Sequence, residues 1–344
     1  MDTTELRALP SPDVPLSTDP GITHDELRLA ARNHAMPLEA LRWSLTPVGM
    51  HYLLVHYDVP LVDPAEWRLE LSGAVGTSLS LSLDDVRARP AVDVTVTMEC
   101  AGNGRALLEP RPLSQPWLTE AVGTARWRGV PLADLLHEAR PADDVVDVVI
   151  GGLDRGVEGG IEQVYARSLP LAEALSSGAV LAYEMNGDPL PAQHGFPLRL
   201  VVPGWYGMTN VKWVDSIVLQ DEPFDGYQVA SAYRVRATEE EAGRPVTRMR
   251  PRALMIPPGL PDFFSRERIL RQEPTVLAGR AWSGQGEITR VEVSVDGVVD
   301  GGPIQVAALV LVLHGEDGLA CSFDTYGLDQ RDEALVAFAA RSSS

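Results

Sequence analysis

One cysteine stands where a predicted strand ends in a glycine-rich turn. The alternating residues Asp93 to Met98 predict the strand, and Cys100 opens the turn Ala101-Gly102-Asn103-Gly104-Arg105. Side chains at such positions often lie at the mouth of a cleft. Cys100 is therefore either a small buried apolar residue or a reactive thiol. Arg105 favours the reactive thiol if it holds a thiolate ionised or binds an anion beside it; otherwise it is an ordinary surface arginine.

Three potential cations surround irregular backbone later in the chain. His194 and Arg199 bracket a glycine and a proline just before the predicted buried strand Leu198 to Val202, and Lys212 follows further on. Arginine binds phosphate oxygens by charge-assisted hydrogen bonds, and lysine binds them as a point charge. The three residues are thus candidates for a phosphate site, although each is equally consistent with a solvated cation. Their spacing matches neither a Walker loop nor a dinucleotide fingerprint.

Three further residues are weaker candidates. Asp154 follows Gly151-Gly152-Leu153, and an aspartate in such a turn usually bonds local backbone. Trp117 and Tyr233 are candidate pocket aromatics, although most tryptophans are packing residues.

Short helices and strands must position these residues. Thr23, followed by Glu26 three positions on, predicts a capped helix start. We expect helices over Thr23 to Ala31, after Ser82, over Pro131 to Ala139 and over Pro170 to Leu175, with further strands over Trp67 to Leu71 and from Leu79.

A change in composition predicts two domains. The segment from Arg236 to Arg252 is charged and has no apolar period, as is typical of a linker. The strand-like stretches Thr275 to Gly279, Ile288 to Val295 and Gln305 to Leu313 follow, separated by glycine-rich turns that favour a small β-sandwich. We therefore expect one domain over residues 23–235 and a second over residues 253–344.

Bulk composition excludes several classes of protein. The 344 residues carry a net charge of -19, which disfavours nucleic acid as a partner. The two cysteines, Cys100 and Cys321, have no metal-finger spacing and are typical of a reducing compartment. The N-terminus shows no export signal, and no apolar run is long enough to span a membrane. We expect a cytoplasmic protein.

The motifs and their order resemble the sulfite oxidases and their bacterial relatives, which bind a mononuclear molybdopterin. The resemblance runs from about His34 to Gly297 and rests on several segments. They are Met98-Glu99-Cys100-Ala101-Gly102-Asn103-Gly104-Arg105, Ala121 to Trp127, Ala182 to Gly187, His194 to Gly204, Val211-Lys212-Trp213, Ala278 to Gly284 and Val291 to Gly297.

This resemblance implies an α+β fold, a cofactor and roles for particular residues. The first domain would be a molybdopterin-binding catalytic domain, and the second an immunoglobulin-like sandwich that forms a homodimer. Cys100 would be the protein's ligand to molybdenum. Arg105, Trp117 and Tyr233 would line the substrate pocket together with Cys100. The pterin and its phosphate would be held by His56, Asp154, His194, Arg199, Asn210, Val211 and Lys212.

The chain departs from the family pattern at three places. Leu54 occupies the position of an anion-binding arginine, two residues before the family histidine at His56. Arg32-Asn33-His34 imitates that motif, but we interpret it as a decoy because it lies too far upstream. The residues after Gly297 depart from the family pattern and provide no counterpart of a further anion-binding arginine. Neither a cytochrome b5-like domain nor a C-x-x-C-H haem motif is present, so electrons would leave to a separate partner.

The implied chemistry is two-electron oxygen-atom transfer, most simply the oxidation of sulfite to sulfate. Losing the arginine at Leu54 removes about 1.5–3 kcal/mol of charge-assisted binding. A less cationic pocket would favour a neutral sulfoxide, so a molybdenum-dependent reductase is the first alternative. A non-catalytic scaffold that keeps the fold is the second.

Overall fold

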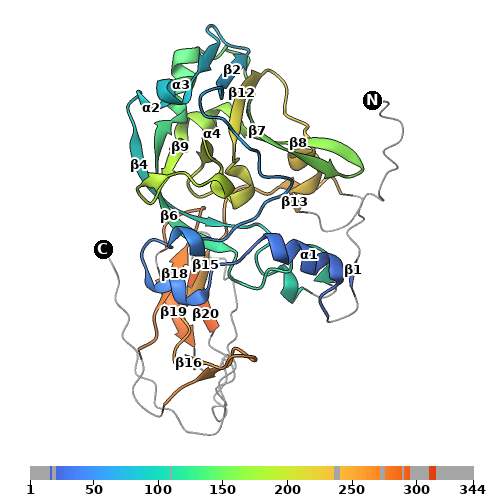
Figure 1. Cartoon of the computed structure of the whole chain (residues 1–344), viewed down its shortest axis with the longest axis vertical. Coiled ribbons are helices and arrows are strands. Elements are labelled where there is room, and N and C mark those ends of the chain that lie inside the picture. The colour runs from blue at the N-terminus through green and yellow to red at the C-terminus, as the bar shows by residue number, and fades with distance from the viewer. Residues whose placement is uncertain are drawn as a thin grey trace. The chain divides into compact units, whose positions relative to one another are not determined.

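The computed structural model describes residues 16–17, 21–108, 111–235, 241–271, 276–288, 290–294 and 310–314 (Figure 1). Cys321 and the predicted strand residues 305–309 lie outside this part. The chain divides into two compact units. The first comprises Met1–Ala35 and His51–Thr247, and the second comprises Met36–Met50 and Arg248–Ser344. The ranges expected from the sequence differ from this division chiefly because residues 36–50 join the second unit.

The described residues of the first unit contain two five-stranded sheets. One has the order β10-β9-β6-β4, with β11 also paired to β9. Its strands are β4 (Val92–Glu99), β6 (Val122–Pro131), β9 (Val180–Met185), β10 (Asp188–Pro189) and β11 (Arg199–Val201). The other has the order β3-β2-β12-β7-β8. Its strands are β2 (Leu69–Gly73), β3 (Leu79–Leu81), β7 (Asp147–Glu158), β8 (Ile161–Pro170) and β12 (Val214–Gln220).

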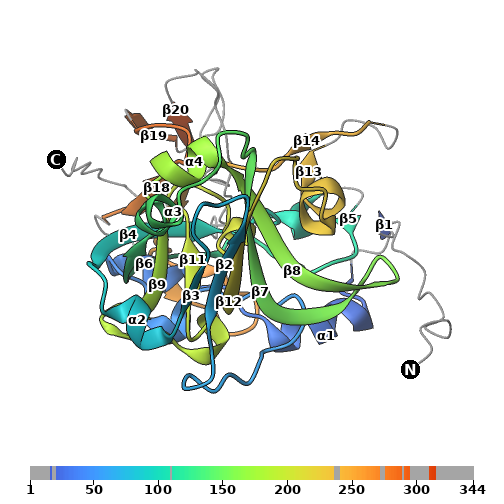
Figure 2. The ribbon, with the colours of Figure 1, turned by 90° about the horizontal axis from the view of Figure 1, so that it is seen from above.

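The strands of these sheets pair antiparallel, except that β12 runs parallel to β2. Figure 2 shows β7 and β8 as a long curved hairpin beside β12. Small two-stranded pairs add β1 (Leu16–Ser17) to β5 (Arg111–Pro112), and β13 (Arg234–Val235) to β14 (Arg244–Pro245). The segment expected to be a linker therefore contains a strand, and Arg252 already begins β15.

The core of the first unit is formed by apolar residues of both sheets and of three short helices, α2 (Leu83–Arg87), α3 (Leu132–Ala139) and α4 (Leu171–Ser176). α3 shows why these sequences form buried helices. Leu132, Leu135, Leu136 and Ala139 are fully buried. Their spacing of three, one and three residues places all four on one helix face, which packs into the core.

Predicted helix starts are confirmed. Helix α1 (His24–Arg32) is capped by Thr23, whose hydroxyl accepts a hydrogen bond from the backbone N–H of Glu26 at 3.3 Å. The Glu26 carboxylate accepts in return from the Thr23 backbone N–H at 2.9 Å. Ser82 and Asp85 form the same reciprocal cap before α2. Each pair satisfies two backbone donors that a helix start leaves free.

The site-bearing backbone also contains 3-10 and π turns. They are η4 (Arg105–Leu107), η5 (Ala192–His194), η6 (Gly207–Thr209) and the π-helix η7 (Gln228–Ala232). Within the residues that the structure describes, no helix is long and apolar enough to cross a membrane.

The second unit contains three strand pairs in its described part, and two 3-10 helices, η2 (Leu38–Arg42) and η3 (Val48–Met50). The pairs join β15 (Arg252–Met255) to β18 (Gly279–Trp282), β16 (Leu260–Pro261) to β17 (Arg268–Ile269), and β19 (Arg290–Ser294) to β20 (Val310–His314). The strand expected over Thr275 to Gly279 is wrong in position, because β18 begins at Gly279. The immunoglobulin-like sandwich stays a prediction.

Candidate functional site

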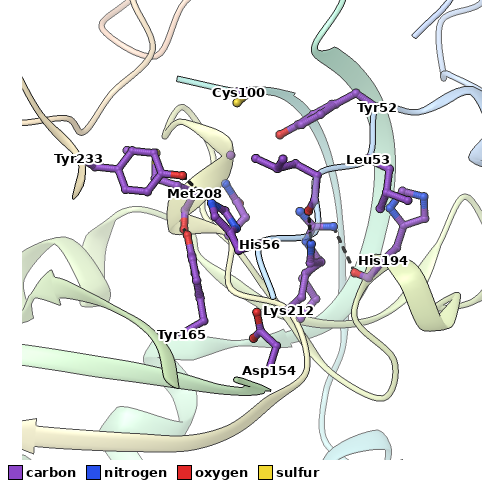
Figure 3. A pocket seen from close by; sticks show the side chains of 14 residues that line it. Tyr52, Leu53, His56, Cys100, Asp154, Tyr165, His194, Met208, Lys212 and Tyr233 are labelled. Carbon is purple, nitrogen blue, oxygen red and sulfur yellow. Dashed lines mark hydrogen bonds between the residues drawn. The ribbon is translucent and has the colours of Figure 1, made fainter. Parts of the chain in front are cut away.

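A pocket lies in the first unit (Figure 3). Eight of the residues singled out in the sequence line it: His56, Cys100, Asp154, His194, Arg199, Asn210, Lys212 and Tyr233. Its other lining residues are Tyr52, Leu53, Leu54, Tyr165, Gly207 and Met208. Candidates spread over most of the chain are thus brought into one pocket, while Arg105, Trp117 and Val211 are not part of its lining.

Both sheets supply the pocket. Cys100 follows the end of β4, and Arg199 begins β11. Asp154 lies in β7 and Tyr165 in β8, while Lys212 precedes β12. Figure 3 shows Cys100 at one end of the pocket, and Asp154 and Lys212 at the other.

The turn after β4 fixes Cys100 in place. Asn103 donates to the Glu99 carboxylate at 3.0 Å and to the Thr119 carbonyl at 2.9 Å, and its own carbonyl accepts from the Ala121 N–H at 3.0 Å. The Cys100 N–H donates to the Ala121 carbonyl at 2.9 Å. These bonds hold the turn against the next segment of chain, so the position of the Cys100 thiol is set by the fold.

Burial raises the pKa of the Cys100 thiol, and three neighbours oppose that rise. They are the Gly102 backbone, the Arg105 charge and the Trp117 side chain, in decreasing order. Arg105 folds over Gly102 and donates to the Ser114 hydroxyl at 2.9 Å. A Cβ at Gly102 would lie 2.6 Å from an Arg105 nitrogen, so a larger residue there would displace the guanidinium from this position. Arg105 and Trp117 therefore lie beside Cys100, although they do not line the cavity.

Arg199 is a buried cation with unused hydrogen-bonding capacity. Its guanidinium donates to the His194 carbonyl at 3.1 Å and to the Met98 sulfur at 3.4 Å, and it lies 5.1 Å from the centre of the Trp127 ring. Its Nε is buried without a partner. Burial lowers the pKa of Arg199 to about 10, so the side chain stays charged near neutral pH.

Lys212 is the second cation of the pocket, and it is partly buried. Its ammonium donates to the carbonyl of Leu54 and lies 4.8 Å from the centre of the Trp213 ring. Burial lowers its pKa, and the Arg199 charge lowers it further. Gly195 has a φ of +113°, and a Cβ there would lie 2.9 Å from the Lys212 Cβ. Glycine at this position therefore allows the His194 segment to pack against Lys212.

Asp154 adds a buried carboxylate at the same end. Its Oδ1 has no hydrogen-bond partner, and burial raises its pKa. Gly152 makes this arrangement possible, because a Cβ there would lie 2.5 Å from the Lys212 carbonyl oxygen. Unused polar atoms on Arg199 and Asp154 beside the Lys212 ammonium are the donors and acceptor that a phosphorylated polar group would satisfy.

The Cys100 end is lined by rings that are neutral near pH 7. His56 Nε2 and the Tyr233 hydroxyl share a hydrogen bond of 2.6 Å, and the Tyr165 ring centre lies 4.8 Å from that of His56. Burial, with the nearby cations second, lowers the pKa of His56 to about 3. Burial raises the pKa of Tyr233. The pair is thus an uncharged hydrogen-bonding group facing the pocket.

Two of the predicted pterin-binding residues have clear structural roles. The Asn210 side chain accepts from the Val202 N–H at 2.7 Å and donates to the Tyr206 carbonyl at 3.1 Å, and it also lines the pocket. Val211 is fully buried, and its carbonyl accepts from the Leu200 N–H at 2.8 Å. Both hold the turn that carries Lys212.

Sequence reasoning missed Tyr52, Tyr165 and Met208 in the lining. Tyr52 lies four residues before His56, so its place beside the family-like histidine was a usable signal. Tyr165 had none, because an aromatic residue in a strand usually indicates core packing. Its hydroxyl donates to the Met208 carbonyl at 2.7 Å, which joins these two lining residues.

The segment interpreted as a decoy lies beside the pocket wall. His34 pairs with Leu53 through two backbone hydrogen bonds of 2.8 and 3.1 Å, and the side-chain Oδ1 of Asn33 accepts from the Val55 N–H at 2.8 Å. Arg32 donates to the Tyr57 carbonyl. The segment thus lies beside the pocket wall although many residues separate it from Leu53 in the sequence. The intervening residues 36–50 belong to the second unit.

Comparisons with known proteins agree with this geometry. The family model for the oxidoreductase molybdopterin-binding domain matches residues 56–228. Mitochondrial sulfite oxidase of Mus musculus is 37% identical over 300 residues, which are 82% of this chain and 54% of that protein. Sulfite oxidase of Gallus gallus is 37% identical over 322 residues, covering 85% and 66%.

The chain thus spans between about half and two thirds of the length of these relatives. Among solved structures, the sulfane dehydrogenase SoxCD from Paracoccus pantotrophus matches with a TM-score of 0.68 and 25% identity, over 83% of this chain and 76% of that one. Residues 56–228, which the family model matches, include Cys100, Arg199 and Lys212 of the pocket. The chain belongs to the sulfite oxidase family of molybdopterin-dependent oxidoreductases.

Proposed function

We propose that the protein oxidises sulfite to sulfate and passes the two electrons to a separate acceptor. The observation that carries this proposal is the pocket itself, which is lined by the buried Cys100 thiol, the buried Arg199 and the partly buried Lys212. Such a pocket fits a phosphorylated cofactor that carries a metal. In the overall reaction sulfite gains an oxygen atom from water, and two protons and two electrons are released.

The residues present fit the molybdenum-molybdopterin cofactor of the family. Arg199 has a buried, unpartnered Nε, and Lys212 supplies a second cation, so both are placed to hold the phosphate. Asp154 has an unused acceptor oxygen that suits the amino and ring N–H groups of a pterin. Cys100 would provide the thiolate ligand. When bound, the cofactor supplies the two-electron oxygen-atom exchange that no side chain can perform.

The remaining pocket residues would bind and orient the substrate. The Tyr233 hydroxyl, held by His56 at 2.6 Å, is placed to donate a hydrogen bond to a substrate oxygen. His56 is neutral near pH 7, so it orients this hydroxyl without adding charge. Arg105 would contribute positive potential beside Cys100, where its charge already opposes the rise in the thiol's pKa.

Leu54 favours a second candidate function. It lines the pocket at the place where the family resemblance expects an anion-binding arginine, and its carbonyl accepts from Lys212. An apolar side chain there suits an uncharged substrate better than an anion. The alternative is therefore a molybdenum-dependent reductase of sulfoxides. A scaffold that keeps the fold without turnover is a third possibility, and metal analysis tests it directly.

The other expectations from the sequence complete the proposal. The second unit would be an immunoglobulin-like sandwich that joins two copies of the chain. The electron acceptor would be a separate protein, and the enzyme would act in the cytoplasm. Sedimentation of the purified protein tests the dimer, with a mass of about twice the 37.3 kDa chain as the expected result.

The central experiment is metal analysis followed by a substrate panel. Purified protein should contain about one molybdenum per chain. With an artificial electron acceptor it should oxidise sulfite, and with an artificial donor it should leave methionine sulfoxide unreduced. Molybdenum-replete protein that reduces the sulfoxide and ignores sulfite would establish the reductase instead. Protein that takes up no molybdenum when produced with a cofactor supply would favour the scaffold.

A further inference from the structure

Arg167 in β8 carries a buried charge that has no acidic partner in the described part of the chain. The residue is only 2% exposed, and its Nε is buried without a hydrogen bond. Nη1 donates to the Gln228 carbonyl, which is its one hydrogen bond to a described residue. An arginine stays protonated at any ordinary pH, so this site holds a charge that the fold leaves uncompensated.

The Arg167 side chain lies directly behind the pocket wall. Tyr165, two residues earlier in β8, lines the pocket, and residues two apart on a strand point to the same face. The Arg167 guanidinium carbon lies 5.5 Å from the centre of the Tyr233 ring. Tyr233 is in turn hydrogen-bonded to His56. The charge therefore sits one ring away from the cavity, behind the wall that His56 and Tyr233 form.

The Arg167 charge also acts on the two ring residues of this wall, His56 and Tyr233. After burial, the cations Lys212, Arg105, Arg167 and Arg32 all lower the pKa of His56. After burial, Cys100 and the Glu158 carboxylate raise the pKa of Tyr233, while the Arg105 and Arg167 charges lower it, so all four groups lie near Tyr233. This pocket is where the family resemblance expects an arginine and this chain has Leu54.

We propose that Arg167 supplies, from behind Tyr233, the positive charge that selects an anionic substrate in place of the arginine missing at Leu54. This inference rests on the proposed oxidation of sulfite. Arg167 is a positioning residue, because it acts through Tyr233 and the local potential. An anion bound in front of Tyr233 would supply the negative charge that Arg167 lacks among the described residues.

Arg32 is the rival source of this charge. It is exposed, and its guanidinium is engaged with the Tyr57 carbonyl. Water and salt screen an exposed charge much more than a buried one. Arg167 therefore has the stronger influence on an anion inside the pocket.

The test compares molybdenum-loaded Arg167→Gln, Arg167→Lys and wild-type protein. Arg155→Gln is the matched control, because Arg155 lies in the paired strand β7 and is exposed. Two quantities are measured: the affinity for sulfate by calorimetry, and kcat and KM for sulfite. Arg167→Gln should weaken sulfate binding and raise the KM for sulfite about tenfold or more, which is the effect of losing one charge-assisted interaction. The lysine variant should recover most of the loss, and Arg155→Gln should show none.

A second variant separates charge from folding. Adding Leu54→Arg to Arg167→Gln returns a positive charge to the pocket from another wall, and it should restore sulfate affinity. Metal-replete Arg167→Gln that binds sulfate like the wild type would overturn the proposal. So would an equal loss in the lysine and glutamine variants, since it would assign Arg167 to holding the Gln228–Tyr233 segment. If the wild type oxidises no sulfite, sulfite oxidation fails, while the sulfate affinities still decide the role of Arg167.

Discussion

The two ends of the pocket differ in charge before any cofactor binds. At one end, Arg199 and Asp154 are buried with polar atoms that no described residue satisfies, and the partly buried ammonium of Lys212 lies near them. At the other, burial raises the pKa values of the Cys100 thiol and of Tyr233 and lowers that of His56, so these groups are neutral near pH 7. The first end is prepared to hold an anion before it arrives. The second acquires its charge only when a metal converts the thiol to a thiolate.

The largest effect should follow substitution at the neutral end. Cys100→Ser should abolish turnover, because a hydroxyl is a harder and more basic ligand than a thiolate. The loss should exceed the ~10–100-fold decrease that follows removal of a group that merely supports a metal ligand. Turnover and molybdenum content are the measurements, with circular dichroism to verify the fold.

Cys321→Ser is the control for this prediction, since Cys321 is the chain's other cysteine. It should keep wild-type turnover. Wild-type activity in Cys100→Ser would instead remove the thiol from the mechanism and, with it, the distinction between the two ends.

A smaller effect should follow at the charged end. Arg199→Met keeps much of the side-chain volume but removes a buried charge, so it should weaken retention of the cofactor about tenfold or more. Specific activity per bound molybdenum should stay within about twofold of wild type, because the chemistry occurs at the other end. Molybdenum content after extensive dialysis measures the first quantity.

Arg128→Met is the matched control, because Arg128 is a half-exposed arginine paired with Asp93 on β4. It should leave cofactor content unchanged. Full molybdenum occupancy in Arg199→Met would place the phosphate elsewhere and break the comparison.

The finest test uses the fact that Lys212 is the only lysine in the chain. Burial lowers its pKa, so in cofactor-free protein the neutral, reactive amine should form at lower pH than the usual value of about 10.4. Acylation should therefore rise between about pH 6 and 8. A bound phosphate favours the ammonium form and should slow this reaction severalfold. Peptide mass spectrometry separates Lys212 from the terminal amine, and equal rates with and without cofactor would contradict the assignment.

The sequence predicted local structure well where one rule dominates. Two helix starts could be predicted, because a cap needs only neighbouring residues: Thr23 with Glu26, and Ser82 with Asp85. Cys100 and Arg199 could be found because each stands at a strand end marked by glycine or proline. The order of the motifs then supplied the family, which no single spacing could have done.

Other features depend on contacts that sequence patterns do not encode. Arg167 reads as an ordinary polar residue in a strand, and only its burial behind Tyr233 gives it meaning. Arg32-Asn33-His34 was interpreted as a decoy for the family motif, and nothing in the sequence indicated that His34 pairs with Leu53 of the pocket wall. The strand at Gly279 was expected too early, because the apolar stretch before it does not set the pairing with β15.

The closure of His34 onto Leu53 has a consequence for synthesis of the chain. Residues 36–50 belong to the second unit, although the chain before and after them belongs to the first. Their partners come much later in the sequence: the Leu41 carbonyl accepts from Arg280 at 2.7 Å, and Glu39 pairs with Arg268. As the chain emerges from the ribosome, the two sheets of the first unit can form once Thr247 is out. Residues 36–50 must wait longer, with Ala40 and Leu41 uncovered, because their partners Arg268 and Arg280 lie more than two hundred residues further along the chain. A nascent chain stalled before Arg252 would expose this loop to chaperones and proteases, while its cofactor pocket was already complete.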